Sequence, residues 1–169
     1  MNLENRIWNL LCNSKYKEYC INAKVEQFQH LDRNINIFIA ITSSGSIAAW
    51  TVWNEYSFIW GLIIAASQVV NILKPYFPFH KFIKEFNSKL VRIEYLNIEI
   101  DKLWFETKNK KNDLNVSEEK YFDLKKQLVD IENFGDETIF KIGKKIDDKA
   151  NQRMKIFLNN NYNTEIKIE

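Results

Sequence analysis

Two long stretches without charged side chains dominate the first half of the chain. Residues 34–54 and 56–73 contain no Asp, Glu, Lys or Arg, and only Glu55 separates them. A helix needs roughly 20 mostly apolar residues to cross a hydrocarbon layer about 30 Å thick, within a usual range of about 17 to 25. The first stretch is long enough, and the second is at the short end of that range. The pattern predicts a transmembrane helical hairpin over residues 34–74, with its turn at Asn54-Glu55.

The segment before the hairpin, residues 1–33, has a helical pattern. Its apolar residues recur at helical spacing, beginning with Leu3, Ile7, Leu10 and Leu11. Asn13-Ser14 is a candidate break, because a serine can cap a second helical segment. The segment lacks an apolar core with a cleavage site, so we do not expect a signal peptide.

A long amphipathic helix is predicted after the hairpin. Pro75 and Pro78 end the second apolar stretch, because proline cannot continue a helix. From Phe79 to about Lys108, apolar side chains follow a heptad-like seam that Lys89 interrupts once: Phe86, Ile93, Leu96, Ile100 and Leu103. The seam can pack against helices of the same chain or serve as an oligomerisation seam. Packing within the chain is favoured, because three heptads are near the minimum for a coiled coil.

Two further helices are expected near the C-terminus. Ser117 is a candidate cap of a helix with the apolar face Tyr121, Leu124, Leu128 and Ile131, and Gly135 suits its end. A last helix can start at Asp136 or Thr138. The predicted fold class is therefore all-α: a transmembrane helical hairpin with a cytosolic N-terminal helix and a C-terminal helical bundle over residues 75–169.

The positive charges that flank the hairpin predict its orientation. Arg33 precedes the first apolar stretch, whereas Lys74, Lys81 and Lys84 follow the second, and the turn between them has neither Lys nor Arg. Positive residues near membrane spans stay on the cytoplasmic side. We therefore expect a multi-pass membrane protein with both termini in the cytoplasm.

Composition and motifs exclude several classes of function. The 24 basic residues are spread among 22 acidic ones, for a net charge of +2, so no nucleic-acid partner is predicted. The two histidines, two cysteines and four glycines match no metal-binding, phosphate-binding or nucleophile motif. We expect no catalytic residue, no metal site and no cofactor, and an enzyme of a familiar class is not predicted.

Polar and small residues inside the two stretches are the candidate functional residues. Amides and hydroxyls in hydrocarbon need partners, so they should face protein or water; the set is Ser43, Ser46, Ser67, Gln68 and Asn71. Gly45/Ala49 and Gly61/Ala65 have the small-xxx-small spacing of packed transmembrane helices. Two interpretations remain open: packing between helices, or an aqueous path. One hairpin cannot enclose a channel, so a path requires a homo-oligomer.

The order of these elements resembles the SLATT family of bacterial two-span membrane effectors. An N-terminal helix leads into two spans with a minimal turn, and a proline-broken exit, KPYFPF, leads into a long helix and further tail helices. The resemblance implies an effector of anti-phage defence that oligomerises and permeabilises the bacterial inner membrane, causing abortive infection. It also implies, besides the lipid bilayer and copies of the chain, an upstream sensor, a signalling protein or a nucleotide second messenger as partner.

Two other interpretations are compatible with the same pattern. The hairpin can be a non-conducting membrane anchor whose cytosolic helices bind a partner protein. Alternatively, the chain can be a soluble helical bundle that buries the hairpin, because fully enclosed helices are apolar all round. This last interpretation requires that the remaining helices of the chain enclose both stretches.

Overall fold

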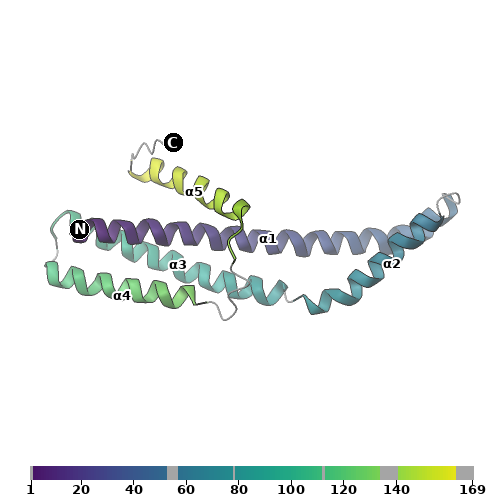
Figure 1. Cartoon of the computed structure of the whole chain (residues 1–169), viewed down its shortest axis with the longest axis horizontal. Helices are drawn as coiled ribbons and strands as arrows, with labels where there is room; N and C mark the ends of the chain where they lie inside the picture. Colours follow the sequence, from purple (N-terminus) through teal and green to yellow (C-terminus); the bar gives the residue numbers. More distant parts are fainter. Residues whose placement is uncertain (1, 53–56, 78, 112, 134–140, 163–169) are drawn as a thin grey trace. The chain divides into compact units, whose positions relative to one another are not determined.

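The computed structural model describes residues 2–52, 57–77, 79–111, 113–133 and 141–162, with the backbone alone over 44–52 and at 57. In these residues every regular element is helical, which confirms the all-α class (Figure 1). The elements are α1 (Leu3–Val52), α2 (Ser57–Leu73), the short 3-10 helix η2 (Lys74–Tyr76), α3 (Phe79–Lys108), α4 (Leu114–Glu132) and α5 (Lys144–Tyr162). The predicted bounds of the long helix at Phe79 and Lys108 are confirmed.

The chain divides into two compact units. Unit 1 consists of Met1–Lys24 together with Glu85–Glu169, and unit 2 consists of Val25–Lys84. Residues 1–24 of the N-terminal segment therefore belong to the same unit as the C-terminal helices, and the rest of the segment belongs to unit 2. Both α1 and α3 extend from one unit into the other.

The core of unit 1 is built from one apolar face of each of its helices. The α3 seam lies at its centre, and its five side chains are 0–3% exposed: Phe86, Ile93, Leu96, Ile100 and Leu103. Removal of such side chains from water contributes roughly 1.5–3 kcal/mol each. The seam is thus filled by helices of the same chain, as the favoured interpretation predicts. Because these side chains are already enclosed, they offer no surface to a second copy, and any oligomerisation surface must consist of other residues.

The predicted break at Asn13-Ser14 is wrong, because α1 runs through it without interruption. Ser14 is fully buried and belongs to a face that continues from Leu11 to Ile21 at helical spacing. Packing of this face stabilises the helix across the serine. Tertiary packing contributes more to helical stability than the weak preference of serine for a helix terminus.

Helix α4 begins one turn earlier than predicted. Asp113 occupies the N-cap position, and the backbone N–H of Ser117 donates to the Asp113 carbonyl over 3.0 Å. Ser117 is 1% exposed and shares the buried face with the four apolar residues predicted for it. Gly135, Asp136 and Thr138 lie outside the described residues. The last described helix, α5, begins at Lys144.

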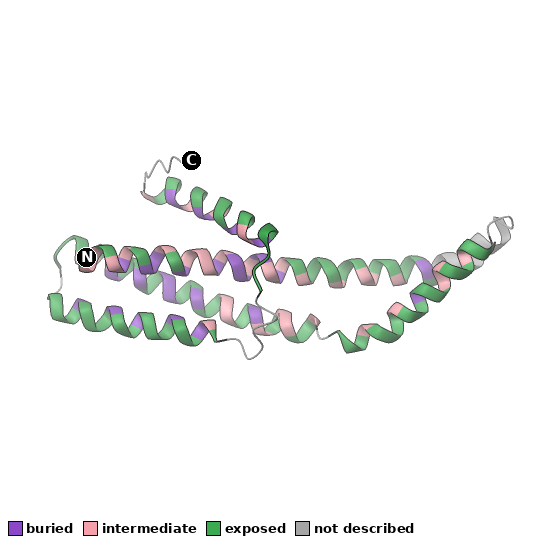
Figure 2. Cartoon of the chain, in the orientation of Figure 1, coloured by how far each residue is buried: buried purple, intermediate pink, exposed green. Residues whose placement is uncertain are grey.

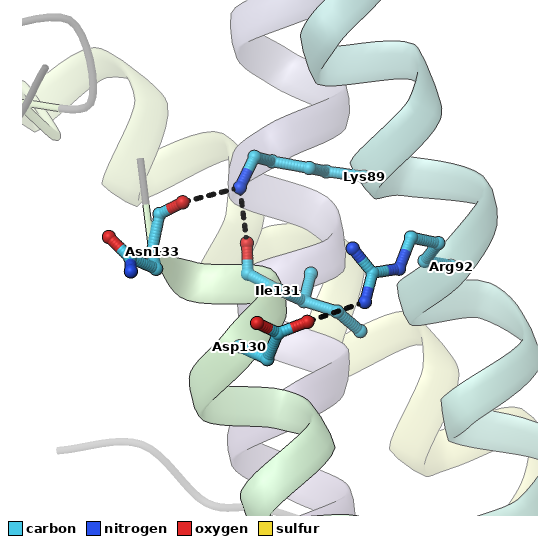
Figure 3. Close-up of polar contacts among 5 residues, drawn as sticks. All are labelled: Lys89, Arg92, Asp130, Ile131 and Asn133. Carbon is cyan, nitrogen blue, oxygen red and sulfur yellow. Dashed lines mark hydrogen bonds and ion pairs between the residues drawn. The ribbon is translucent and has the colours of Figure 1, made fainter. Parts of the chain in front are cut away.

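Lys89, which interrupts the α3 seam, holds the C-terminal end of α4 (Figure 3). Its Nζ donates to the carbonyl oxygens of Ile131 and Asn133 over 2.8 and 2.7 Å. The last carbonyls of a helix have no partner within the helix and carry a partial negative charge, so a lysine suits this position. Beside it, the Arg92 guanidinium pairs with Asp130 over 2.7 Å. Burial lowers the pKa of Lys89, which the carboxylates of Glu85 and Asp130 counteract.

Further polar contacts cross between helices inside unit 1. The buried carboxylate of Glu18 on α1 accepts from the Asn97 amide on α3 over 2.6 Å and from Lys15 over 2.8 Å. At one end of α5, the Tyr16 hydroxyl donates to Asp147 over 2.6 Å. At the other end, the Tyr162 hydroxyl donates to Asp101 over 2.7 Å. These bonds, together with a core of Cys20, Ala23, Ile146 and Ala150, attach α5 to α1 and α3.

Candidate functional site

The outer surface of α2 is the most unusual surface that the structure describes. Among the described residues, one helical stretch, Phe58–Tyr76, is long and apolar enough to cross a membrane, with a mean hydropathy of 1.4. Only 6% of that stretch is buried, and Figure 2 shows α2 as mostly exposed. Large apolar side chains on it are open to the surroundings: Phe58, Ile59, Leu62, Val69, Ile72 and Leu73. The core helix of a soluble bundle would have most of these side chains enclosed.

One narrow face of α2 is covered within unit 2. Its buried and half-buried residues recur every three or four positions: Trp60, Ile63, Ile64, Ser67 and Val70. This is the spacing of a single helix face. The rest of the circumference is apolar as well, but it is exposed. The soluble-bundle interpretation required α2 to be enclosed by the remaining helices, and this is not what the structure shows.

The part of α1 in unit 2 also has one covered face and an exposed apolar circumference, over the residues whose side chains are described. Half-buried or buried residues recur at Phe28, Asp32, Ile35, Ile39 and Thr42. On the remaining circumference, exposed apolar side chains lie between them: Ile37, Phe38 and Ile41. The predicted first stretch continues through residues whose side chains lie outside the description, so its membrane-spanning character stays a prediction.

The hydroxyl groups on the covered faces are satisfied by their own helices. The Ser67 hydroxyl donates to the Ile64 carbonyl over 2.8 Å, and Ser67 is buried. The Thr42 hydroxyl lies 2.9 Å from the Phe38 carbonyl oxygen and 3.1 Å from that of Ile39. Neither hydroxyl needs water or a second helix as partner. Ser67 is therefore placed at a packing face, and Thr42, which the sequence analysis did not select, occupies the equivalent place on α1.

Gln68 and Asn71 have a different environment from Ser67, although all three lie within five residues. Both amide side chains are exposed, and within the described residues neither makes a hydrogen bond. Ser43 on α1 is also exposed. Ser46 lies outside the described side chains. The structure therefore separates the predicted polar set into an inward serine and two outward amides on α2.

The small residues of α2 also face outward. Gly61 and Ala65 are exposed, and a Cβ added at Gly61 would meet no atom within 4 Å. Positions 61, 65 and 68 follow one another at intervals of four and three, so these residues and the Gln68 amide share one side of the helix. This side of the helix is exposed at all three positions. Gly45 and Ala49 lie outside the described side chains.

Charged side chains of unit 2 gather at the end where the proline elbow lies. Lys74 of η2 donates to the Asn36 side-chain carbonyl of α1, and the Asn36 amide donates to Asp32 over 3.1 Å. Nearby in the sequence, the Arg33 guanidinium donates to the His30 ring over 2.9 Å. Between this end and the turn, residues 37–43 and 57–73 carry no charge. The polar end and the apolar surface are thus segregated along the same two helices.

Metal-ligating and nucleophilic side chains are the next groups to consider among the described residues. No group of three or more His, Cys, Asp or Glu side chains among them is placed to hold a metal ion. Burial raises the pKa of the Cys12 thiol to about 11 and raises that of Cys20, so both thiols stay protonated at neutral pH. Protonated thiols are poor nucleophiles.

No family model matches this chain, and searches of the curated proteins and of the solved structures gave no match either.

Proposed function

We propose that this chain is a membrane effector that inserts a two-helix hairpin into the bilayer, assembles with copies of itself and makes the membrane permeable. The observation that carries the proposal is the exposed apolar circumference of α2. Each large apolar side chain left in water forgoes roughly 1.5–3 kcal/mol relative to burial. A hydrocarbon surrounding removes that cost for all of these side chains at once.

Assembly of several hairpins is supported by the polar side chains on the same surface. In hydrocarbon, the exposed amides of Gln68 and Asn71 need partners that the described residues of their own chain do not supply. Copies of the hairpin, or water enclosed by several copies, supply them. Gly61 and Ala65 on the neighbouring positions permit close approach of another helix. In this proposal the amides line a polar path, and the covered face with Ser67 holds the hairpin together.

The biological setting follows from the resemblance to the SLATT family. In that setting the chain acts at the inner membrane of a bacterium, with both termini in the cytoplasm, and permeabilises the membrane after a phage infection is sensed. The trigger reaches the chain through unit 1, from a sensor, a signalling protein or a nucleotide second messenger.

The proposal is tested by dye release from liposomes that contain the full chain. We expect the wild type to release dye, and the double variant Gln68→Leu/Asn71→Leu to release it several-fold more slowly, because hydrogen bonds between transmembrane helices contribute about 0.6 to 2 kcal/mol each. Ile72→Leu, on an exposed apolar position of the same helix, is the matched control and should leave release unchanged. A wild-type chain that is inserted and assembled but never releases dye contradicts the proposal.

A second candidate function is that of a non-conducting anchor whose cytosolic helices bind a partner protein. The observation that favours it is that unit 1 has a core of its own and exposes large apolar side chains on α3 and α4, including Tyr95, Ile98 and Leu114. Because Met1–Lys24 belongs to unit 1, residues 79–169 alone would lack part of the core. The anchor is therefore tested in the full chain. It predicts that Tyr95→Ser/Ile98→Ser abolishes partner binding, whereas Gln68→Leu/Asn71→Leu affects no readout.

A further inference from the structure

A groove between α3 and α4 of unit 1 has an apolar floor and an acidic rim. It encloses about 540 Å³, and the buried side chains of Leu103 and Leu124 form its floor. Its rim carries four carboxylates, from Glu99 and Glu106 on α3 and from Glu119 and Asp123 on α4, against the ammonium groups of Lys102 and Lys120. With four negative and two positive groups, the lining has a net charge of −2. This groove suits a helix that presents an apolar side chain among basic ones.

The outer face of α5 has that composition. Between Lys144 and Tyr162, α5 carries five basic and two acidic residues, a net charge of +3. One of the two carboxylates, that of Asp147, is engaged by Tyr16. The buried residues Ile146, Ala150, Met154 and Leu158 mark the inner face. On the opposite side, Ile156 is exposed together with Lys145, Lys149 and Lys155, and one carboxylate, that of Asp148, lies on the same side. The outer face thus presents one apolar side chain and an excess of basic ones along its length.

The groove and the outer face of α5 cannot meet within one chain. Both α4 and α5 pack on α1 and α3, and Figure 1 shows them on opposite sides of α1. The acidic surface of one copy is therefore available to the basic surface of another copy. A contact between two different surfaces of identical chains is heterologous, and it generates a closed ring when the rotation between neighbours closes.

We propose that α5 of one copy docks in the α3–α4 groove of the next copy, with Ile156 directed to the apolar floor and the lysines directed to the acidic rim. The inference rests on the proposed function, because it names the partner, a second copy, and the surface by which effector chains assemble. It assigns assembly to outward residues of α3, α4 and α5, in place of the enclosed α3 seam.

A charge-swap experiment on the full chain in detergent tests the proposal, with the molar mass of the protein component as readout. The acidic-rim variant Glu99→Lys/Glu119→Lys and the α5 variant Lys145→Glu/Lys155→Glu should each reduce the assembly to single chains of 20.2 kDa at concentrations where the wild type is assembled. For each of the two variants, the protein concentration at which half of the assembly dissociates should also rise at least tenfold. A chain that carries all four changes should assemble again, because the opposite charges are exchanged but still face each other.

The matched control is Lys125→Glu/Lys126→Glu, which reverses two exposed lysines of α4 outside the groove lining and should leave the mass unchanged. Far-UV circular dichroism checks that every variant keeps its helix content. Failure of the fourfold variant to reassemble, or a mass unchanged by either double variant, overturns the proposal. The proposal is also overturned if the wild type remains a single chain, or if the acidic rim binds only a basic peptide of another protein. Because mass is measured without a bilayer, correct assembly without dye release would contradict the proposed function alone.

Discussion

Units 1 and 2 use the same types of side chain in opposite places. In unit 1, apolar residues such as Ile93 and Ile100 are fully enclosed, and polar groups bond across helices, as Asn97 does to Glu18. In unit 2, apolar residues such as Leu62 and Ile72 are exposed, whereas Thr42 and Ser67 are enclosed and bond to their own helices. The first arrangement is stable in water. The second leaves apolar surface without cover from the described residues, and its helix α2 is long and apolar enough to cross a membrane. This contrast is the physical basis for the proposal that unit 2 inserts into a bilayer.

The largest expected change in the free energy of unfolding comes from a substitution in the core of unit 1. Ile93→Ala should lower the free energy of unfolding by about 2–5 kcal/mol, because it removes apolar contacts and leaves a cavity. Ile98→Ala, five residues further along the same helix but 65% exposed, should cost less than about 0.5 kcal/mol. Thermal unfolding followed by circular dichroism in detergent measures both. Equal losses would show that the assigned inside and outside of α3 are wrong.

The second-largest effect is expected when an exposed valine is replaced by lysine in unit 2, compared with the same replacement in unit 1. Val69 on α2 and Val129 on α4 are 55% and 61% exposed, so both are surface valines. Val69→Lys should disfavour membrane insertion by about 2.5–3.5 kcal/mol, because it places a charge in hydrocarbon. Val129→Lys should change stability by less than about 0.5 kcal/mol, because it faces water. The carbonate-resistant membrane fraction measures insertion, and retention of Val69→Lys at the wild-type level argues against a span.

A smaller effect is expected from the lysine at the end of α4. Lys89→Met removes two hydrogen bonds to the Ile131 and Asn133 carbonyls, so we expect a loss of about 1.5 kcal/mol, the low end for bonds to charged groups. Arg92→Met removes only an exposed ion pair with Asp130 and should cost about 0.2–1 kcal/mol. Denaturant unfolding in detergent separates the two. The reverse order would mean that Lys89 does not stabilise the end of α4.

The smallest effect depends on pH and concerns the attachment of α5. The hydrogen bond to Asp147, with burial second, raises the pKa of Tyr16 above its usual value of about 10. Because the folded state favours the protonated phenol, this stabilisation is complete below pH ~10 and is lost as the pH rises further. Tyr16→Phe should cost about 0.5–1.5 kcal/mol at pH 8 and reduce the loss of stability at alkaline pH.

Melting temperatures of the wild type and Tyr16→Phe from pH 8 to 11.5 provide the measurement. Tyr95→Phe, at an exposed tyrosine of α3, serves as the control and should follow the wild type at every pH. Parallel curves for the wild type and Tyr16→Phe would show that the Tyr16–Asp147 bond contributes nothing to the attachment of α5.

Periodic apolar positions were predicted well, and isolated polar residues were not. The bounds of α3 and the buried faces of α3 and α4 follow from helical spacing, and the structure confirms them. The sequence predicts helix boundaries at Ser14 and Ser117, and both predictions are wrong. The cap preference of a serine is local, whereas both residues lie on faces that tertiary contacts bury. In the sequence, Lys89 interrupts the α3 seam, and the structure explains its place there, because it binds two carbonyls at the end of α4.

The candidate site shows the same division. In the sequence, Ser67, Gln68 and Asn71 form one polar set, because all three interrupt an apolar stretch. Their separation into one enclosed hydroxyl and two exposed amides depends on which side of α2 is covered. Likewise, the small residues at 61 and 65 predicted close packing, but the structure leaves that side of the helix open for a contact outside the chain.

The sequence by itself determined the helical class, the apolar stretch long enough to cross a membrane and the faces by which α3 and α4 pack. These features depend on residue type and spacing within one helix, which are local. The tertiary structure decided that α1 continues through Ser14 as one helix and that the α3 seam is filled by its own chain. It also decided that Gln68 and Gly61 point outward. Such outcomes depend on which other helix occupies the neighbouring space, and residues distant in the sequence supply that helix.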